Sequence, residues 1–404
     1  MKCIHPLLKG REQDLIQQKL QDAMAIADID FLMLVRADNI FYATGLRSNF
    51  AFQYNGSVCD TIALVPRSGK ILLIVNNLEQ DCAENSAADG VDVESYLSGA
   101  FIDDGSALSR GDKILDRFAA LRVAFAHTGK HAKVATETAV IPHEAWDLIC
   151  STYGEVRDAE PVVMQARRIK TPWEIETLRN AVQLTETVWD RIADEIEPGM
   201  NALELSRKFK GYSLEQDPLC AISDDQFIPA VGHFIGVGPM PRNYIIQDGD
   251  IIKFDAGFRY CNYTSDIART LAVGTVPDTA VEIYNILYKA NRTGAEAIRP
   301  GVRFSEIYWI VRSEVEKSSL IPRYPRGNVG HSIGVCPQIV EGPAFTANCH
   351  ERIEEGMVFT LETPWSGAKG AVVNAGYNIE DCYVVTKDGM EQFTHAPKTI
   401  YWGR

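Results

Sequence analysis

The sequence predicts a two-domain protein, with an α/β domain over residues 1–160 and a second domain over residues 161–404. A chain of 404 residues exceeds what one hydrophobic core usually serves, so two domains are expected. In the first 160 residues, segments with helical spacing alternate with short apolar segments that are typical of strands. A strong helix start near Thr171 then marks the beginning of the second part.

The α/β prediction depends on five segments, taken in chain order. Residues 12–27 carry apolar side chains at helical spacing, and the apolar run 30–35 is typical of a strand. Residues 39–45 are interpreted as a turn. The apolar runs 61–65 and 71–75 flank a segment with proline, serine and glycine, which predicts a β-hairpin.

A capping box marks the helix near the domain boundary. Thr171 stands at the N-cap position, Pro172 at the first helical position and Glu174 three residues after the cap. Apolar residues continue at helical spacing, and the helix is expected to end near residue 195, before a proline and a glycine. The domain boundary is placed just ahead of this helix.

Composition and charge argue against several classes of protein. The net charge of −14 disfavours binding to nucleic acid or anionic membranes, and no apolar run approaches the ~18–20 residues of a membrane span. The nine cysteines form no CxxC pair and their number is odd, which favours reduced thiols over a disulfide framework. Since no signal peptide is visible, we expect a cytoplasmic protein.

The residues that point to chemistry begin with two aspartates in the second domain. Asp255 and Asp266 are eleven residues apart, which is close to three helical turns. The residues around and between them are rich in β-branched and aromatic types, so a bent hairpin with both carboxylates on one side is predicted instead. Asp255 lies inside an apolar strand, where an ionised carboxylate needs a strong partner, either an arginine or a metal.

Three further polar residues follow in strand-like surroundings. His331 lies between glycines, Glu362 ends an apolar strand, and Glu380 lies inside another strand. Taken singly, such residues are more often ion-pair partners or hydrogen-bonded structural groups. Together with Asp255 and Asp266 they form an oxygen-rich set that suits Mn²⁺, Fe²⁺ or Co²⁺. Such a set can hold two metals, which polarise a carbonyl and generate hydroxide at neutral pH.

This ordered set resembles the pita-bread metallohydrolase family of methionine aminopeptidase, aminopeptidase P, prolidase and creatinase. Residues 30–45 resemble the N-terminal domain of the prolidase and creatinase branch, and residues 168–175 resemble its domain-joining helix start. The resemblance implies an α/β N-terminal domain and an α+β pita-bread catalytic domain, in which helices back a curved antiparallel sheet. It also implies a homodimer.

The resemblance implies a role for each of the five residues. Asp255 would chelate one metal, His331 and Glu362 the other, and Asp266 and Glu380 would bridge the two. The expected catalytic residues are Glu362 and His331, with a metal-bridging hydroxide as nucleophile and Glu362 as its proton shuttle. The implied cofactors are two divalent metal ions, with manganese preferred and iron, cobalt or zinc as alternatives.

Around the substrate, the sequence departs from the family's pattern. A family histidine that lies over the metals is Gly238 here, and His233 is the candidate to bind substrate in its place. A second family histidine is replaced by Gln338 or by Val340, depending on the alignment. The arginine two residues before the last glutamate is Asn378. Since these groups hold substrate rather than metal, metal binding is expected to survive, whereas the dipeptide specificity stays open.

Two kinds of residue next to the ligand set are interpreted separately. Arg269, three residues after Asp266, is predicted to orient a ligand carboxylate, with a structural salt bridge as the alternative. Cys336 and Cys382 are interpreted as buried small hydrophobes, because no base stands near them in the sequence.

The predicted function is metal-dependent hydrolysis of a C–N (amide) bond, similar to that of a Xaa-Pro dipeptidase or aminopeptidase. One alternative is a hydrolase of a small non-peptide amide or amidine, similar to creatinase or ectoine hydrolase. Another is a non-catalytic pita-bread binding protein. The expected partners are a small peptide or small amide substrate and a second copy of the chain, with neither nucleic acid nor membrane.

Overall fold

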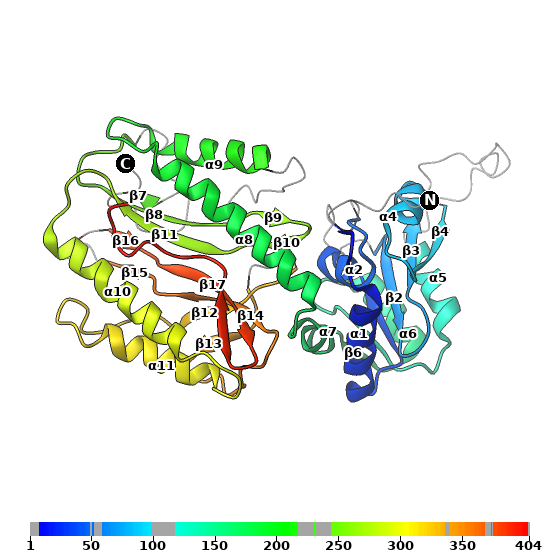
Figure 1. The fold of residues 1–404 in the computed structure, drawn as a ribbon. Helices are drawn as coiled ribbons and strands as arrows, with labels where there is room; N and C mark the ends of the chain where they lie inside the picture. The colour runs from blue at the N-terminus through cyan, green and yellow to red at the C-terminus, as the bar shows by residue number, and fades with distance from the viewer. Residues whose placement is uncertain are drawn as a thin grey trace. The chain divides into compact units, whose positions relative to one another are not determined.

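A computed structural model of the chain contains two compact units, Met1–Trp173 and Glu174–Arg404 (Figure 1). The structure describes residues 8–48, 51, 59–97, 118–216, 230–231, 244–335, 340–367, 373 and 375–402. None of the helices formed by these residues is long and apolar enough to cross a lipid bilayer.

The first unit is an α/β domain built on a six-stranded mixed sheet of order β4-β3-β2-β1-β5-β6. Strands β1, β2 and β3 pair antiparallel, which confirms the predicted hairpin, and the other three strands pair parallel with their neighbours. The strands are β1 (Phe31–Leu34), β2 (Ile62–Pro66), β3 (Leu72–Asn76), β4 (Asp92–Tyr96), β5 (Val134–Thr136) and β6 (Val156–Asp158). The helices are α1 (Gln13–Ala27), α2 (Ala37–Thr44), α4 (Gln80–Ser86), α5 (Ala119–Thr128), α6 (His143–Tyr153) and α7 (Glu160–Arg167), and α7 packs against α1.

Helix α2 corrects the prediction of a turn over residues 39–45. Asn39 lies inside the helix, which ends at Gly45 with a φ of 76°. The Asn39 side chain donates a hydrogen bond to Glu137, and it accepts one from Arg167 over 2.6 Å. Local sequence alone favours a turn here, but these buried tertiary contacts stabilise the helix.

The second unit contains a curved antiparallel sheet of order β13-β12-β14-β17-β11-β8-β7, with β18 paired to β17. Strands β8 and β11 pair antiparallel, which confirms the predicted hairpin around the two aspartates. The sheet strands are β7 (Ala230–Val231), β8 (Ile251–Ala256), β11 (Ile267–Ala272), β12 (Asn328–Ser332), β13 (Glu341–Thr346), β14 (Val358–Glu362), β17 (Glu380–Thr386) and β18 (Gly389–Gln392). Two small ribbons pair β9 (Arg259–Tyr260) with β10 (Tyr263–Thr264), and β15 (Trp365–Ser366) with β16 (Gly376–Tyr377).

Helices back this sheet, as Figure 1 shows. Helix α8 (Pro172–Ala193), which the capping box predicts, begins two residues before the second unit, and α9 (Ala202–Gln216), α10 (Asp278–Glu296) and α11 (Phe304–Val315) lie within it. Trp189 of α8 stacks on Phe209 of α9 and on Phe254 of β8, each with ring centroids 4.3 Å apart. Helices α10 and α11 pack against each other and against strands β12, β13 and β14. This backing holds the ligand-bearing strands in place.

Candidate metal centre

The five predicted ligand residues come from five neighbouring strands of the curved sheet. Asp255 lies near the end of β8, Asp266 directly precedes β11, His331 lies in β12, and Glu362 ends β14 as predicted. Glu380 is the first residue of β17, not an interior residue as the sequence predicted. Cross-strand pairing places Glu362 opposite Glu380, and Ala268 opposite both Asp255 and Glu380. The register therefore places Asp255, Glu362 and Glu380 at one level of the sheet.

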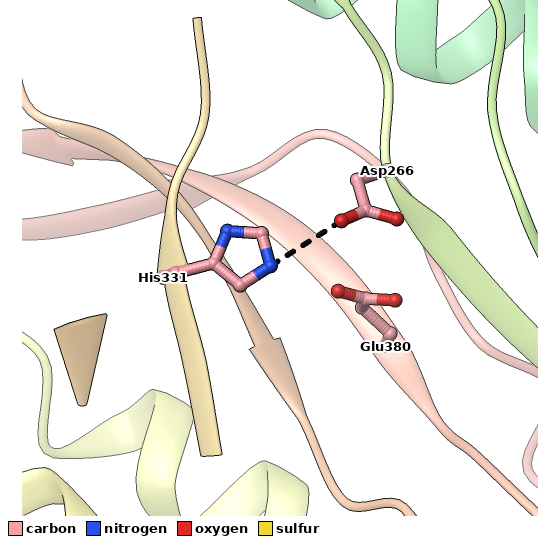
Figure 2. A group of neighbouring side chains, drawn as sticks. All are labelled: Asp266, His331 and Glu380. Atoms are coloured by element: carbon pink, nitrogen blue, oxygen red, sulfur yellow. Dashed lines mark ion pairs between the residues drawn. The ribbon is translucent and has the colours of Figure 1, made fainter. Parts of the chain in front are cut away.

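Asp266, His331 and Glu380 form the tightest part of the cluster (Figure 2). One potential ligand atom from each residue lies within 4.8 Å of the other two. His331 Nε2 is 3.3 Å from Asp266 Oδ2, and all three side chains are buried. His331 Nδ1 lies 3.1 Å from the carbonyl oxygen of Ser332, which orients the ring so that Nε2 faces the two carboxylates.

Asp255 and Glu362 are joined through a shared amide. Asn378 Nδ2 donates to Asp255 Oδ2 over 3.3 Å and to Glu362 Oε2 over 3.2 Å. Each carboxylate also meets a basic residue, since Lys253 Nζ is 3.0 Å from Asp255 Oδ2 and Arg326 Nη2 is 2.9 Å from Glu362 Oε1. The sequence predicts an arginine or a metal as the strong partner of Asp255, and the basic residue that pairs with it among the described residues is a lysine.

The crowded acids shift one another's pKa values. Burial raises the pKa of Glu380 well above its ordinary value, and the charges of Asp266, Glu362 and Asp255 raise it further. Burial also raises the pKa values of Asp266 and Glu362, although His331 and Arg326 respectively oppose the rise. For His331, burial lowers the pKa but the Asp266 carboxylate outweighs it, so the net pKa is raised. Four acids at one place hold excess negative charge, and divalent cations would relieve it.

The donor set therefore fits divalent metal ions. Oxygen ligands from four carboxylates with one imidazole nitrogen match the preferences of Mn²⁺, Fe²⁺ and Co²⁺. A group of acids whose pKa values are raised by burial, and further by mutual repulsion, is costly to ionise without such a counterion.

Two glycines allow the strands to approach closely at the cluster. Gly330, beside His331, has a φ of +134°, and a Cβ there would meet the carbonyl oxygen of Thr360 at 2.2 Å. A Cβ on Gly257 would meet the carbonyl oxygen of Ser265 at 1.9 Å, inside the hairpin between the two aspartates. Side chains at either position would push apart the strands that carry the ligands.

Arg269 and Cys382 contact the backbone of two candidate ligand residues. Arg269 Nη1 donates to the backbone carbonyl of Glu380 over 2.6 Å, and its guanidinium pairs with the buried Asp381 over 3.0 Å. Arg269 thus contacts the backbone of Glu380 rather than its carboxylate, and it also forms a buried salt bridge. Cys382 is buried, as predicted, and its thiol donates to the carbonyl oxygen of Asp266 over 3.1 Å.

The positions that depart from the family's pattern are only partly described. His233, Gly238, Gln338 and Cys336 lie outside the described residues. Val340 is 55% exposed, whereas Asn378 is fully buried between Asp255 and Glu362.

Sequence reasoning missed two basic residues at the site. Lys253 is two residues before Asp255 on the same strand, and the two-residue period of a strand places both side chains on one face. That period was a usable signal. Arg326 precedes β12 in a loop, and no periodic pattern links it to Glu362.

The sheet, its helical backing and the buried acidic cluster together define a metal-dependent hydrolase of pita-bread architecture. The sequence profile described as metallopeptidase family M24 matches residues 176–387, and that of the creatinase/prolidase N-terminal domain matches residues 17–169. The chain belongs to metallopeptidase family M24.

Individual relatives agree with this assignment. An uncharacterized peptidase YqhT of Bacillus subtilis is 28% identical over 61% of this chain and 69% of its own length. A Xaa-Pro dipeptidase of Lactobacillus helveticus is 29% identical over 60% of this chain. That alignment covers 64% of the Lactobacillus protein, which is just under two thirds of its length.

Solved structures share the fold across nearly the whole chain. A Xaa-Pro dipeptidase from Bacillus anthracis has a TM-score of 0.77 at 22% identity, covering 96% of this chain and 98% of its own. The prolidase from Pyrococcus horikoshii OT3 has a TM-score of 0.76 at 22% identity, covering 95% and 98%. These likenesses confirm the two-domain pita-bread fold.

Proposed function

We propose that this chain is a dinuclear metal-dependent hydrolase that cleaves the amide bond of Xaa-Pro dipeptides. The observation that carries the proposal is the convergence of five potential ligand side chains from five strands, with three of them within 4.8 Å. Relatives named as Xaa-Pro dipeptidases support the choice of substrate.

The proposed ligand roles follow the order of the strands. Asp255 would hold one metal, His331 and Glu362 the other, and Asp266 and Glu380 would be shared by both. The buried position of Asp266 and Glu380 beside His331 supports their bridging role. When bound, two divalent cations, preferably Mn²⁺, supply the Lewis acidity that polarises the amide carbonyl and acidifies water.

Glu362 is proposed to move the proton. In the metal-free chain, burial raises the pKa of this carboxylate, although Arg326 opposes the rise. Arg326 and Asn378 hold its Oε1 and Oε2 atoms, which restrains the carboxylate in one orientation. In this proposal Glu362 accepts the proton of the attacking water and passes it to the departing amine.

Two further predictions accompany this function. The scattered cysteines favour a reducing compartment, which supports a cytoplasmic location. The family resemblance supports a homodimer, and light scattering on the purified chain measures its mass directly.

A substrate panel tests the proposed function. We expect the Mn²⁺-loaded chain to hydrolyse Ala-Pro and Gly-Pro, to cleave Ala-Ala poorly, and to leave creatine intact. Chelation should abolish cleavage, and added Mn²⁺ should restore it. Hydrolysis of creatine or another small amide without cleavage of Ala-Pro would contradict the dipeptidase assignment.

A further inference from the structure

We propose that Arg326, assisted by Tyr324, holds a carboxylate of the substrate beside Glu362 and so selects substrates with a free carboxyl end. The inference rests on the proposed function, because it concerns the substrate of the same site. It assigns a specificity role to residues that lie outside the metal ligand set.

The Arg326 guanidinium is fixed at the edge of the cluster. Its Nη2 donates to Glu362 Oε1 over 2.9 Å and to Asn328 Oδ1 over 3.0 Å. The backbone carbonyl of Arg326 accepts a hydrogen bond from the Tyr308 hydroxyl of α11 over 2.8 Å. The side chain is nevertheless 39% exposed, so solvent and substrate can reach it. Its buried Nε has no hydrogen-bond partner among the described residues.

Tyr324, two residues before Arg326, carries a second potential donor. The ring is fully buried, and its hydroxyl has no hydrogen-bond partner within the described part of the chain. The charge of Glu362 acts on this hydroxyl, since it adds to the rise that burial causes in the pKa of Tyr324. A buried tyrosine hydroxyl normally has a partner, so an acceptor from a ligand would complete its hydrogen bonding.

The charge of the loaded centre favours an anion at this position. The four carboxylates of Asp255, Asp266, Glu362 and Glu380 would balance two divalent cations. Lys253 and Arg326 then leave positive charge in excess. Of the two, Arg326 is the more exposed, and its guanidinium can donate a charge-assisted hydrogen bond to a carboxylate.

Asn378 and Arg326 contact different oxygens of Glu362. The family resemblance places an arginine at the position of Asn378, but here a buried asparagine spans Asp255 and Glu362. Arg326 instead approaches Glu362 from the β12 side of the sheet. The substrate's carboxylate is therefore expected on the β12 side of Glu362.

Calorimetric binding of two probes to the Mn²⁺-loaded full chain tests this inference. L-proline carries the carboxylate, and L-prolinamide replaces it with a neutral amide. We expect the parent to bind L-proline about tenfold or more tightly than L-prolinamide, as charge-assisted hydrogen bonds do. Arg326→Gln should reduce that ratio to about one, with Mn²⁺ stoichiometry and melting temperature unchanged. Arg326→Lys should retain part of the preference, because an ammonium keeps the charge but has fewer donors than a guanidinium.

Arg323→Gln is the matched control, because Arg323 is an exposed residue of the same loop and the charge change is identical. It should leave the ratio unchanged. Tyr324→Phe removes only a hydroxyl, and we expect it to weaken L-proline binding about threefold or more. If Arg326→Gln does not fold, the L-proline affinity of Tyr324→Phe tests the inference instead.

Several results would overturn the inference. The first is a parent that binds both probes equally or binds neither. The second is an Arg326→Gln variant that keeps the parent's affinity ratio. If only Tyr324→Phe folds, an L-proline affinity equal to the parent's would overturn the inference. None of these readouts requires turnover. A parent that discriminates the probes but does not cleave Ala-Pro would therefore refute the proposed function and leave the carboxylate site standing.

Discussion

Glu362 faces a different partner with each of its carboxylate oxygens. Oε1 accepts from Arg326 and Oε2 accepts from Asn378, which also contacts Asp255. A carboxylate restrained on both sides loses little orientational freedom when it binds a metal or a proton. At the scale of single residues, the site therefore depends on its neighbours as much as on its ligands.

Replacing Asp266, one of the two proposed bridging acids, should reduce metal content without unfolding the chain. Asp266→Asn conserves shape but removes the charge that lets one carboxylate serve two cations. We expect fewer Mn²⁺ ions per chain by elemental analysis, with an unchanged circular dichroism spectrum. The exposed Asp278→Asn, which makes the same charge change on α10, should bind metal like the parent. A variant that binds two metals as tightly as the parent would show that Asp266 is not a bridge.

Removing the Lys253 side chain should strengthen metal binding, whereas Asp266→Asn should weaken it. Its ammonium lies 3.0 Å from Asp255 Oδ2, where it competes with a cation for the same oxygen. We therefore expect Lys253→Met to raise Mn²⁺ affinity about two- to fivefold in calorimetric titration. Lys289→Met removes a lysine that pairs with Glu314 on the helices and should change nothing. Weaker binding by the Lys253 variant would mean that the lysine supports the site.

At the scale of elements, the close approach of β12 and β14 sets the position of His331. Gly330→Ala would bring a Cβ within 2.2 Å of the Thr360 carbonyl, at a φ of +134° that alanine rarely adopts. We expect a loss of about 1–3 kcal/mol in the free energy of unfolding by urea, together with weaker Mn²⁺ binding.

The nearby Gly327→Ala provides the comparison for this prediction. A Cβ at Gly327 would meet nothing within 4 Å. Its free energy of unfolding should stay close to the parent's. Equal stabilities of the two variants would contradict the close packing of β12 on β14.

The same elements show what sequence could and could not predict. The hairpin of β8 and β11 and the capped helix α8 follow from local pattern, and the structure has both. Helix α2 was mistaken for a turn because the contacts of Asn39 with Glu137 and Arg167 join distant segments. Arg326 reaches Glu362 across 36 residues from an irregular loop, so no local period could connect them. The candidate ligands on strands follow one another in a recognisable order along the sequence, whereas a loop residue such as Arg326 has no such pattern.

At the scale of the whole molecule, the buried acids couple stability to pH. The pKa values of Asp266, Glu362 and Glu380 are raised in the folded chain, so the folded state binds more protons than the unfolded state. Without metal, these acids therefore make the chain less stable as pH rises above the ordinary carboxylate range. Metal bound to these acids would replace the protons and so prevent the loss of stability at higher pH.

This coupling predicts stronger Mn²⁺ binding at higher pH. Each metal must displace protons from the acids and from His331, whose pKa is also raised. We expect the affinity to increase, and the rise in melting temperature on adding Mn²⁺ to grow, between about pH 6 and about pH 8. Titrations in buffers of different ionisation enthalpy should reveal proton release. Affinity that is independent of pH would contradict the shared protonation of the cluster.

The most direct test of the proposed dinuclear mechanism is a titration of the chelator-treated chain with Mn²⁺, followed by hydrolysis of Ala-Pro. The five-ligand cluster predicts no hydrolysis without metal and a rise that levels off at two Mn²⁺ ions per chain. Full hydrolysis after chelation, or none at any Mn²⁺ concentration, would contradict it.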